Sequence, residues 1–444
     1  MKYFPHTSED IQQMLKCVGV NSLDELYSEV PKELLFKGEL DMPSAMSEIE
    51  VRKVVNEMAD KNDRLISFGG AGVYDHYTPS VVPYLASRSE FSTSYTPYQA
   101  EISQGTLQYI FEYQSMMADL TGMDVSNASM YDGSTATAEA MMMCVAAAKK
   151  RNKVIISESF NPIVLRVVST YAKYHGVDLV KVPAREGVTD KAAMISLLKA
   201  DDVAGVIVPQ PNYYGLIEDF EGLAEACHAH KSLLVINTVA SALGVLKSPG
   251  EWGADIACGD AQSLGIPSCF GGPYIGYMCT TNALVRKMPG RLVGATTDAE
   301  GRRCFVLTLQ AREQHIRREK ATSNICTAQG VMCLYVAAYL SLMGPQGLRE
   351  VNELSYAGAH YLYDLLVEMD GFEPVYEGSF LNEFTLRYTG EMDLHDLRQA
   401  LAYQGYLAGV EVEGTSDAVI FAVTEQRTKQ EIDDFVALIR QFVD

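Results

Sequence analysis

Two tyrosines and a glutamate lie close together in one short stretch of this 444-residue chain. Residues 91–105, FSTSYTPYQAEISQG, place Tyr95, Tyr98 and Glu101 around Pro97, just before an expected helix. Phenols and an amide can donate hydrogen bonds to a small polar substrate, and a carboxylate can act as an acid or a base. The alternative is a capping turn whose tyrosines pack on the surface. Tyr95, Tyr98 and Glu101 are therefore candidate catalytic residues.

A second loop, residues 69–79, carries a single imidazole. Its sequence, GGAGVYDHYTP, is too rich in glycine for regular structure and contains one histidine, His76. Histidine can act as an acid or a base near neutral pH, although a lone histidine is more often structural. His76 joins the candidate catalytic residues, beside the alternative that it only supports the loop.

The turn at residues 131–135 could hold a phosphate. Its sequence, YDGST, leads into an alanine- and methionine-rich segment that is expected to be a helix. Glycine lets the backbone approach a ligand, hydroxyls can donate hydrogen bonds, and a helix N-terminus favours an anion. The alternative is an ordinary helix cap followed by helix-forming alanines. Both interpretations stay open.

Residues 253–267 lack a lysine that their pattern leads us to expect. This segment, GADIACGDAQSLGIP, resembles the strand and turn that carry the Schiff-base lysine in pyridoxal-phosphate (PLP) enzymes, yet no lysine lies between Lys247 and Lys287. Without a primary amine the turn cannot form an aldimine. Asn237 also stands where these enzymes usually place an aspartate against the pyridine nitrogen, and an amide cannot supply that charge. A cofactor site that has lost its function explains both changes.

The elements around these loops alternate between helices and strands. Helices are expected at residues 104–121 and 135–151, and short apolar strands at 154–156, 203–208 and 233–236. Residues 177–182 form a fourth candidate strand, with two charges that favour a less buried position. Such alternation predicts the α/β class, with a mostly parallel sheet covered on both faces.

The same pattern divides the chain into three expected parts. Residues 1–60 show apolar side chains at helical spacing, interrupted by prolines, and are expected to form a helical arm. Residues 61–330 are expected to form a large α/β domain that contains the degenerate PLP site. Residues 331–444 mix helices with short strands and are expected to form a smaller α+β C-terminal domain.

Composition limits the possible classes of binding partner and the possible cellular location. The formal net charge is −21 at pH 7 and the pI is about 4.8, which argues against nucleic acid and anionic membranes as partners. We find neither an apolar signal core at the N-terminus nor a run long enough to span a bilayer, so a cytoplasmic protein is expected. The nine cysteines form no C-x-x-C pair, and His228 and His230 stand too close for helical metal ligation. No metal site is expected.

Several long and uncommon sequence words occur in order along the chain. They are PHT at 5–7, GAG at 70–72 with DH at 75–76, SYTPYQAEI at 94–102, YDGSTA at 131–136, QSLGIP at 262–267 and REQHIRREKATSNIC at 312–326. On these words the chain resembles the alpha subunits of the two-subunit bacterial glycine dehydrogenase (decarboxylating), the P-protein of the glycine cleavage system. The resemblance covers nearly the whole chain.

That resemblance implies a PLP-dependent fold type I architecture and a heterotetramer with a beta subunit that bears the PLP lysine. This chain would then bind no cofactor covalently, and the active site would lie between the two subunits. The implied reaction is decarboxylation of glycine, followed by transfer of the aminomethyl group to the lipoyl arm of H-protein. Tyr95 and Tyr98 would orient the substrate or the lipoyl group, and Glu101 would hold the loop or relay a proton.

Two alternatives stay open. The chain could be a non-catalytic pseudoenzyme that only stabilises its partner. It could also be a free-standing PLP enzyme that uses Lys287, although this lysine follows the Gly-Gly-Pro strand where the Schiff-base lysine should precede it. Activity lost on substitution in the loop from Tyr95 to Glu101, with assembly intact, would favour a catalytic subunit.

Overall fold

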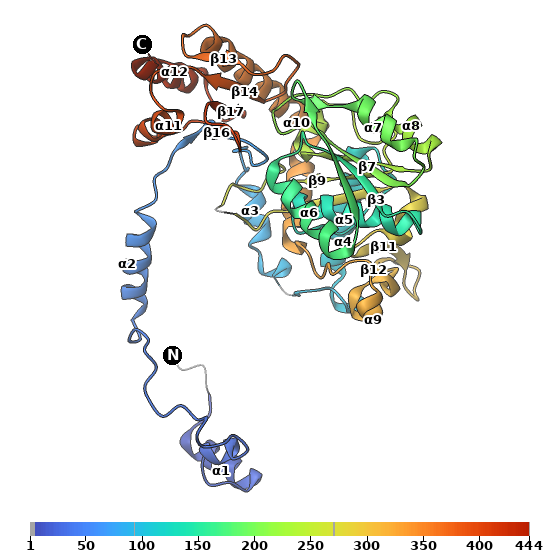
Figure 1. Ribbon diagram of the computed structural model, residues 1–444. Coiled ribbons are helices and arrows are strands. Elements are labelled where there is room, and N and C mark those ends of the chain that lie inside the picture. Colours follow the sequence, from blue (N-terminus) through green and yellow to red (C-terminus); the bar gives the residue numbers. More distant parts are fainter. Residues whose placement is uncertain (1–4, 93, 270, 444) are drawn as a thin grey trace. The chain divides into compact units, whose positions relative to one another are not determined.

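The structure of the chain is a computed structural model that describes residues 5–92, 94–269 and 271–443 (Figure 1). Contacts within it separate two units, residues 1–63 and residues 64–444.

The first unit has a helix near each of its ends. Its described α-helices are α1 (Ser8–Val18) and α2 (Glu48–Ala59). Both begin with a capping box, made by Thr7 with Asp10 and by Ser47 with Glu50. The stretch between them is irregular apart from a 3-10 turn at Asp24–Tyr27, because the prolines there interrupt helical hydrogen bonding. The expected helical arm is therefore helical only in part.

A seven-stranded sheet forms the centre of the second unit. Its order is β2-β10-β9-β8-β7-β3-β4. The strands are β2 (Val125–Ser126), β3 (Lys153–Ser157), β4 (Asp178–Val182), β7 (Val203–Gln210), β8 (Leu233–Thr238), β9 (Ile256–Asp260) and β10 (Gly276–Thr280). Strands β4, β3, β7, β8 and β9 run parallel, and only β10 is antiparallel to both of its neighbours. The mostly parallel sheet is confirmed, with the charged strand β4 at its less buried edge.

Helices cover both faces of this sheet. Successive strand residues point to opposite faces, so Ile156 packs under α5 (Gly133–Ala148) and α6 (Pro162–His175). Ile155 packs on the other side with α7 (Lys191–Leu198) and α8 (Leu223–Ala229). Ala257 and Tyr277 pack with α4 (Gln104–Thr121) and the start of α10 (Gly330–Val367). These layers fix the loops at the ends of the strands.

A smaller antiparallel sheet follows toward the C-terminus, in the order β13-β14-β17-β16. Its strands are β13 (Phe372–Pro374), β14 (Glu383–Tyr388), β16 (Val410–Glu411) and β17 (Ala418–Ala422). Its core includes residues from α10, α11 (Leu394–Tyr403) and α12 (Lys429–Val443). Strand β1 (Ile66–Ser67) pairs with β15 (Tyr406–Leu407), so the start of the second unit joins this C-terminal part.

Helix α10 contributes to both cores. Val336 packs in the core of the large sheet and Leu362 in that of the small sheet, on either side of a kink at Gly344, whose φ is 61°. It is the one described helix that is long and apolar enough to cross a membrane, and Val336 and Leu362 are among its buried residues. Because α10 begins at Gly330 and belongs to both cores, the expected domain limit at 330 stays a prediction.

Two hairpins and two short α-helices also belong to the second unit. They are β5 (Ala184–Arg185) with β6 (Val188–Thr189), β11 (Leu292–Thr297) with β12 (Arg303–Thr308), α3 (Val81–Ala86) and α9 (Gln314–Arg317).

Candidate functional site

A cavity of about 260 Å³ opens at the carboxyl ends of the parallel strands. Pro209, Asn237 and Asp260, near the ends of β7, β8 and β9, line it together with the first turn of α5 and Glu383 at the start of β14. Ligands of open parallel sheets bind at this edge. The cavity is therefore where a cofactor of this fold would be expected.

No lysine lines this cavity among the residues that the structure describes. In the turn after β9, Gln262 is buried, and its Nε2 donates to the carbonyl oxygens of Tyr74 (3.1 Å) and Ile266 (2.7 Å). Its Oε1 accepts the backbone N–H of Tyr74 at 3.2 Å. This side chain ties two loops together and provides no amine. Lys287 ends an exposed 3-10 turn (Asn282–Lys287) and does not line the cavity either, so the free-standing PLP enzyme has no support here.

The first turn of α5 is capped by carboxylates of the chain itself. Asp132 is the N-cap and accepts the backbone N–H of Thr135 at 2.8 Å. Asp260 reaches over from β9, and its Oδ2 accepts the N–H of Gly133 at 3.1 Å. A Cβ on Gly133 would stand 2.9 Å from the backbone nitrogen of Asp260, so only glycine allows the helix to approach β9 so closely. Of the two open interpretations of this turn, the structure shows the helix cap.

The polar groups of the cavity do not fit PLP. Asn237 donates from Nδ2 to the hydroxyl of Thr137 at 2.8 Å and carries no charge to set against a pyridinium nitrogen. Where a cofactor phosphate would accept helix N–H groups, the carboxylate of Asp260 already accepts one. The cavity also lacks an amine for the aldimine. We therefore derive no chemistry through a cofactor in this chain.

Glu383 is a buried acid in the same cavity that sequence reasoning missed. Tyr74 donates its hydroxyl to Oε2 at 2.7 Å, and the backbone N–H of Ala71 donates to Oε1. Burial raises the pKa of Glu383 to about 7, although both hydrogen bonds favour its charged form. A glutamate at the head of an apolar strand, LNEFTL, was the signal available in the sequence.

A second cavity, of about 300 Å³, lies against the loop that contains the candidate tyrosines. Tyr95 lines it and is 87% exposed, whereas Tyr98, which is about half exposed, turns toward Arg291. Arg291 donates from Nη2 to the phenol oxygen of Tyr98 at 2.8 Å, and its guanidinium carbon lies 5.2 Å from the centre of that ring. The loop thus presents one phenol outward and fixes the other.

Arg291 and Glu313 form a buried pair under this loop. Their exposed fractions are 7% and 8%, and Nε of Arg291 lies 3.5 Å from Oε2 of Glu313. His315 completes the cluster, with its ring 5.6 Å from the ring of Tyr98 and Nδ1 3.7 Å from Glu313. In the described part of the chain, Nε of Arg291 and Oε1 of Glu313 have no hydrogen-bond partner. Sequence reasoning did not find Arg291, because nothing in its own neighbourhood marks it.

The other side of the loop is held by a turn at residues 326–328. The hydroxyls of Thr96 and Thr327 lie 2.7 Å apart, and Tyr131 bonds the backbone of Cys326 through its hydroxyl. Thr327 and Ala328 both have positive φ, 61° and 54°, a strained conformation for residues with a side chain. Strain of this kind is maintained only where surrounding contacts hold the backbone in place, so the loop rests on a fixed support.

Glu101 is not part of these contacts. It lies in a 3-10 turn (Ala100–Ile102), is exposed, and makes no hydrogen bond or ion pair with any described residue. The structure therefore brings Tyr98 into contact with Arg291, leaves Tyr95 exposed at the wall of the second cavity, and leaves Glu101 at the surface. The catalytic roles expected for Tyr95, Tyr98 and Glu101 stay predictions.

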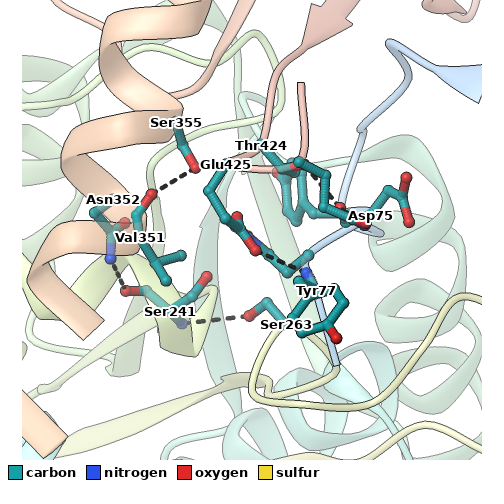
Figure 2. Close-up of polar contacts among 12 residues, drawn as sticks. Asp75, Tyr77, Ser241, Ser263, Val351, Asn352, Ser355, Thr424 and Glu425 are labelled. Atoms are coloured by element: carbon teal, nitrogen blue, oxygen red, sulfur yellow. Dashed lines mark hydrogen bonds and ion pairs between the residues drawn. The ribbon is translucent and has the colours of Figure 1, made fainter. Parts of the chain in front are cut away.

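His76 lies elsewhere, in a buried polar contact with the C-terminal part. Its Nδ1 is 2.6 Å from Oε2 of Glu425, and the backbone N–H of Tyr77 donates to Oε1 of the same carboxylate at 2.7 Å. Figure 2 shows Glu425 directed at Tyr77, with Thr424 donating its hydroxyl to the carbonyl of Asp75 at 2.7 Å. None of the hydrogen bonds described for His76 reaches the tyrosine loop. These contacts fasten the loop at 70–78 to the connection between β17 and α12.

Comparison with solved structures defines the class. The chain superposes on the crystal structure of a glycine decarboxylase (P-protein) of the glycine cleavage system in inhibitor-bound form with a TM-score of 0.93, at 42% identity over 99% of this chain and 100% of that chain. A glutamate decarboxylase from Lactobacillus brevis shares the fold at 14% identity, with a TM-score of 0.70 over 95% and 96% of the two chains. The fold is that of PLP-dependent enzymes of fold type I.

Sequence comparison then defines the family. Residues 1–439 match the family described as glycine cleavage system P-protein. Proteins named probable glycine dehydrogenase (decarboxylating) subunit 1 are 48% identical in Anoxybacillus flavithermus, over 98% of both chains, and 46% identical in Carboxydothermus hydrogenoformans, over 99% of both. The chain belongs to the P-protein family of the glycine cleavage system, and the resemblance predicted from the sequence is confirmed.

Proposed function

We propose that this chain is the alpha subunit of a two-subunit glycine decarboxylase and is active only with a partner subunit that carries PLP. The observation that carries the proposal is the combination of a P-protein fold with a cavity that does not fit the cofactor. Gln262 stands in the turn where an amine is needed, and Asp260 stands where a phosphate would bind. The decarboxylation of glycine then depends on an aldimine lysine in another chain.

In this proposal the contribution of the chain is the loop around Tyr95. The phenol of Tyr95 is exposed, while the loop beneath it is fixed through Tyr98 to Arg291 and through Thr96 to Thr327. A donor that projects from a fixed loop can act in an active site formed with a second subunit, since its position is set before the subunits meet. Tyr95 would orient glycine, or the lipoyl arm of H-protein that receives the aminomethyl group.

The first unit supports the assembly with a partner. Leu15 is its one buried apolar side chain among the described residues, while Leu34 and Phe36 are about 70% exposed, at 72% and 69%. Further exposed apolar side chains follow in the same unit: Leu23, Leu26, Tyr27, Leu40, Met42, Ile49, Val55 and Met58. Apolar surface on this scale marks a protein interaction site. We propose that it packs on the PLP-bearing subunit.

The competing proposal is a pseudoenzyme that only stabilises its partner. The cavity that does not fit PLP favours both proposals equally. They differ over the exposed phenol of Tyr95, which only the catalytic proposal requires. A comparison of two tyrosines with equal exposure separates them, because Tyr403 on α11 is also 87% exposed.

The test assembles the two subunits with Y95F or with Y403F in this chain and measures glycine decarboxylation and aminomethyl transfer to lipoylated H-protein. We expect Y95F to lower the rate by at least about tenfold, as expected for one lost hydrogen bond to a reacting group, with Y403F unchanged. Sedimentation of both assemblies checks that association is intact. Equal rates for Y95F, Y403F and the unaltered chain would contradict the catalytic proposal and support the pseudoenzyme.

We also propose a cytoplasmic location. All nine cysteines are free thiols, which suits a compartment that keeps thiols reduced. Cell fractionation with detection of the chain would test this, and its recovery outside the cytoplasm would contradict it.

A further inference from the structure

The N-terminus of α5 is already bound by an anion, and that anion belongs to the protein. Asp260, the last residue of β9, directs Oδ2 at the N–H of Gly133 (3.1 Å) and Oδ1 at the N–H of Gln262 (2.7 Å). Both N–H groups belong to the turns that surround the end of the cavity. The side chain therefore binds the helix terminus as a bound phosphate would, through backbone donors.

A second carboxylate stands beside the first. Asp132 caps the same helix and accepts the N–H of Thr135. Burial raises the pKa of Asp260 to about 6, and the charge of Asp132 adds to that rise. Both carboxylates line the cavity. A phosphate monoester brought to this helix end would find backbone N–H groups that already donate to the carboxylates. The two negatively charged carboxylates would also repel it at short range. The partial positive charge of the helix terminus is too small to offset that repulsion.

The close packing of α5 on β9 holds the carboxyl group of Asp260 against the N–H of Gly133. The first turn of α5 approaches β9 so closely that a Cβ on Gly133 would stand 3.0 Å from the Cβ of Asp260. The carboxyl group of Asp260 extends from this contact into the cavity, so a ligand can reach the N–H of Gly133 only after that carboxyl group has moved. Because Gln262 also donates to Asp260, such a movement breaks two hydrogen bonds.

We propose that Asp260 is an internal ligand of the α5 N-terminus that closes this cavity to phosphorylated molecules. The loss of the Schiff-base lysine alone would leave a chain that could still bind PLP non-covalently. With Asp260 in the anion position, PLP is excluded as well, and an assembled enzyme carries it only in the partner subunit. This inference concerns the full chain by itself and does not depend on any catalytic role of the loop around Tyr95.

The test uses a ligand that cannot form an aldimine with surface lysines. Deoxypyridoxine phosphate is the analogue of PLP without the aldehyde, and deoxypyridoxine is the same ring without the phosphate. Equilibrium dialysis of the full chain measures the affinity for each. We expect the unaltered chain to show no preference for the phosphorylated compound. D260S opens the anion position and supplies a hydroxyl, so it should prefer the phosphorylated compound by about tenfold or more.

Two further variants make the outcome decisive. E383Q changes a carboxyl group in the same cavity that does not touch α5, and it should behave as the unaltered chain does. D260A also removes the group that occupies the N–H of Gly133, so it replaces D260S if circular dichroism shows that D260S is unfolded. A phosphate preference in the unaltered chain would overturn the proposal, and so would a folded Asp260 variant with no gain.

Discussion

The guanidinium of Arg291 and the phenol of Tyr98 meet at 2.8 Å, across a sequence separation of 193 residues. Arg291 is buried and paired with Glu313, while Tyr98 belongs to the exposed loop that carries Tyr95. The buried pair therefore helps to set the position of the loop, in addition to the packing of Phe91 and Ala100 on the apolar core. A charged donor makes a stronger hydrogen bond than a neutral one, which suits a contact that must hold the loop in the free subunit.

Removing this donor should lower activity while the assembly persists. R291M removes the hydrogen bond to Tyr98 and leaves Glu313 without a cationic partner. We expect the rate of glycine decarboxylation by the assembled enzyme to fall by about tenfold or more. R302M is the matched control, because Arg302 is exposed and pairs only with the surface acids Asp298 and Glu300. If the free-energy effects of R291M and Y98F on activity are additive in the double variant, the two residues do not act through their contact.

Glu383 should make stability depend on pH. Its pKa is about 7 in the folded chain and 4.5 in an unperturbed glutamate, so the folded chain binds this proton more tightly than the unfolded chain does. The resulting stabilisation is complete below about pH 4.5 and is lost as the pH rises to about 7, a change of about 3 kcal/mol. Urea unfolding across this range should therefore show a flatter pH dependence for E383Q than for the unaltered chain.

A control for this measurement is available in α5. Burial also raises the pKa of Glu139 to about 7, so E139Q should flatten the same curve by itself. E300Q, at an exposed residue, should leave the curve unchanged. Identical pH profiles for E383Q and the unaltered chain would contradict the assignment of a tightly bound proton to Glu383.

The apolar surface of the first unit should contribute to binding of the partner subunit. L34S and F36S each remove a large exposed apolar side chain, and burial of one such side chain in an interface corresponds to a change of about tenfold in affinity. L354S, on the exposed side of α10, is the control. Sedimentation or calorimetry with the partner should show weaker binding for the first two variants and unchanged melting of the isolated chain. Equal affinities would place the interface elsewhere.

His76 should matter for stability more than for chemistry. H76A removes one of the two hydrogen-bond partners of the buried carboxylate of Glu425 and leaves it the N–H of Tyr77, and we expect the free energy of unfolding to fall by roughly 2 kcal/mol. H228A is the comparison, since His228 pairs with Asp255 at a half-exposed position. The catalytic role expected for His76 stays a prediction, and unchanged stability of H76A with strongly reduced glycine decarboxylation would support it.

Local sequence patterns predicted the helices and strands well where the spacing of apolar side chains agrees with the residues that start and end a helix. Helix α4 begins and ends at Gln104 and Thr121 as predicted, and the strand at 154–156 lies within β3. The arm at 1–60 was predicted less well, because apolar spacing persists through segments where prolines prevent a helix. The short hairpins β5–β6 and β11–β12 were not predicted, since two to six residues give little periodic signal.

The candidate site shows where such reasoning ends. The missing lysine and Asn237 could be recognised because each stands in a familiar local pattern. The contact of Asp260 with Gly133 spans 127 residues, and that of Glu383 with Tyr74 spans 309. Contacts between residues so far apart in the sequence depend on the strand order of the sheet and on the packing of the C-terminal part. No local sequence pattern predicts either of these. Arg291 was not predicted for the same reason, because its role depends on a contact with a loop that is distant in the sequence.

The most direct test of the account is to locate the cofactor in the assembled enzyme. Borohydride reduction of the two subunits with PLP, followed by peptide mapping, fixes any aldimine to its lysine. We expect one adduct, on the partner subunit, and none on this chain, whether it is alone or assembled. A stoichiometric adduct on a lysine of this chain, Lys287 included, would contradict the division of the active site between two subunits.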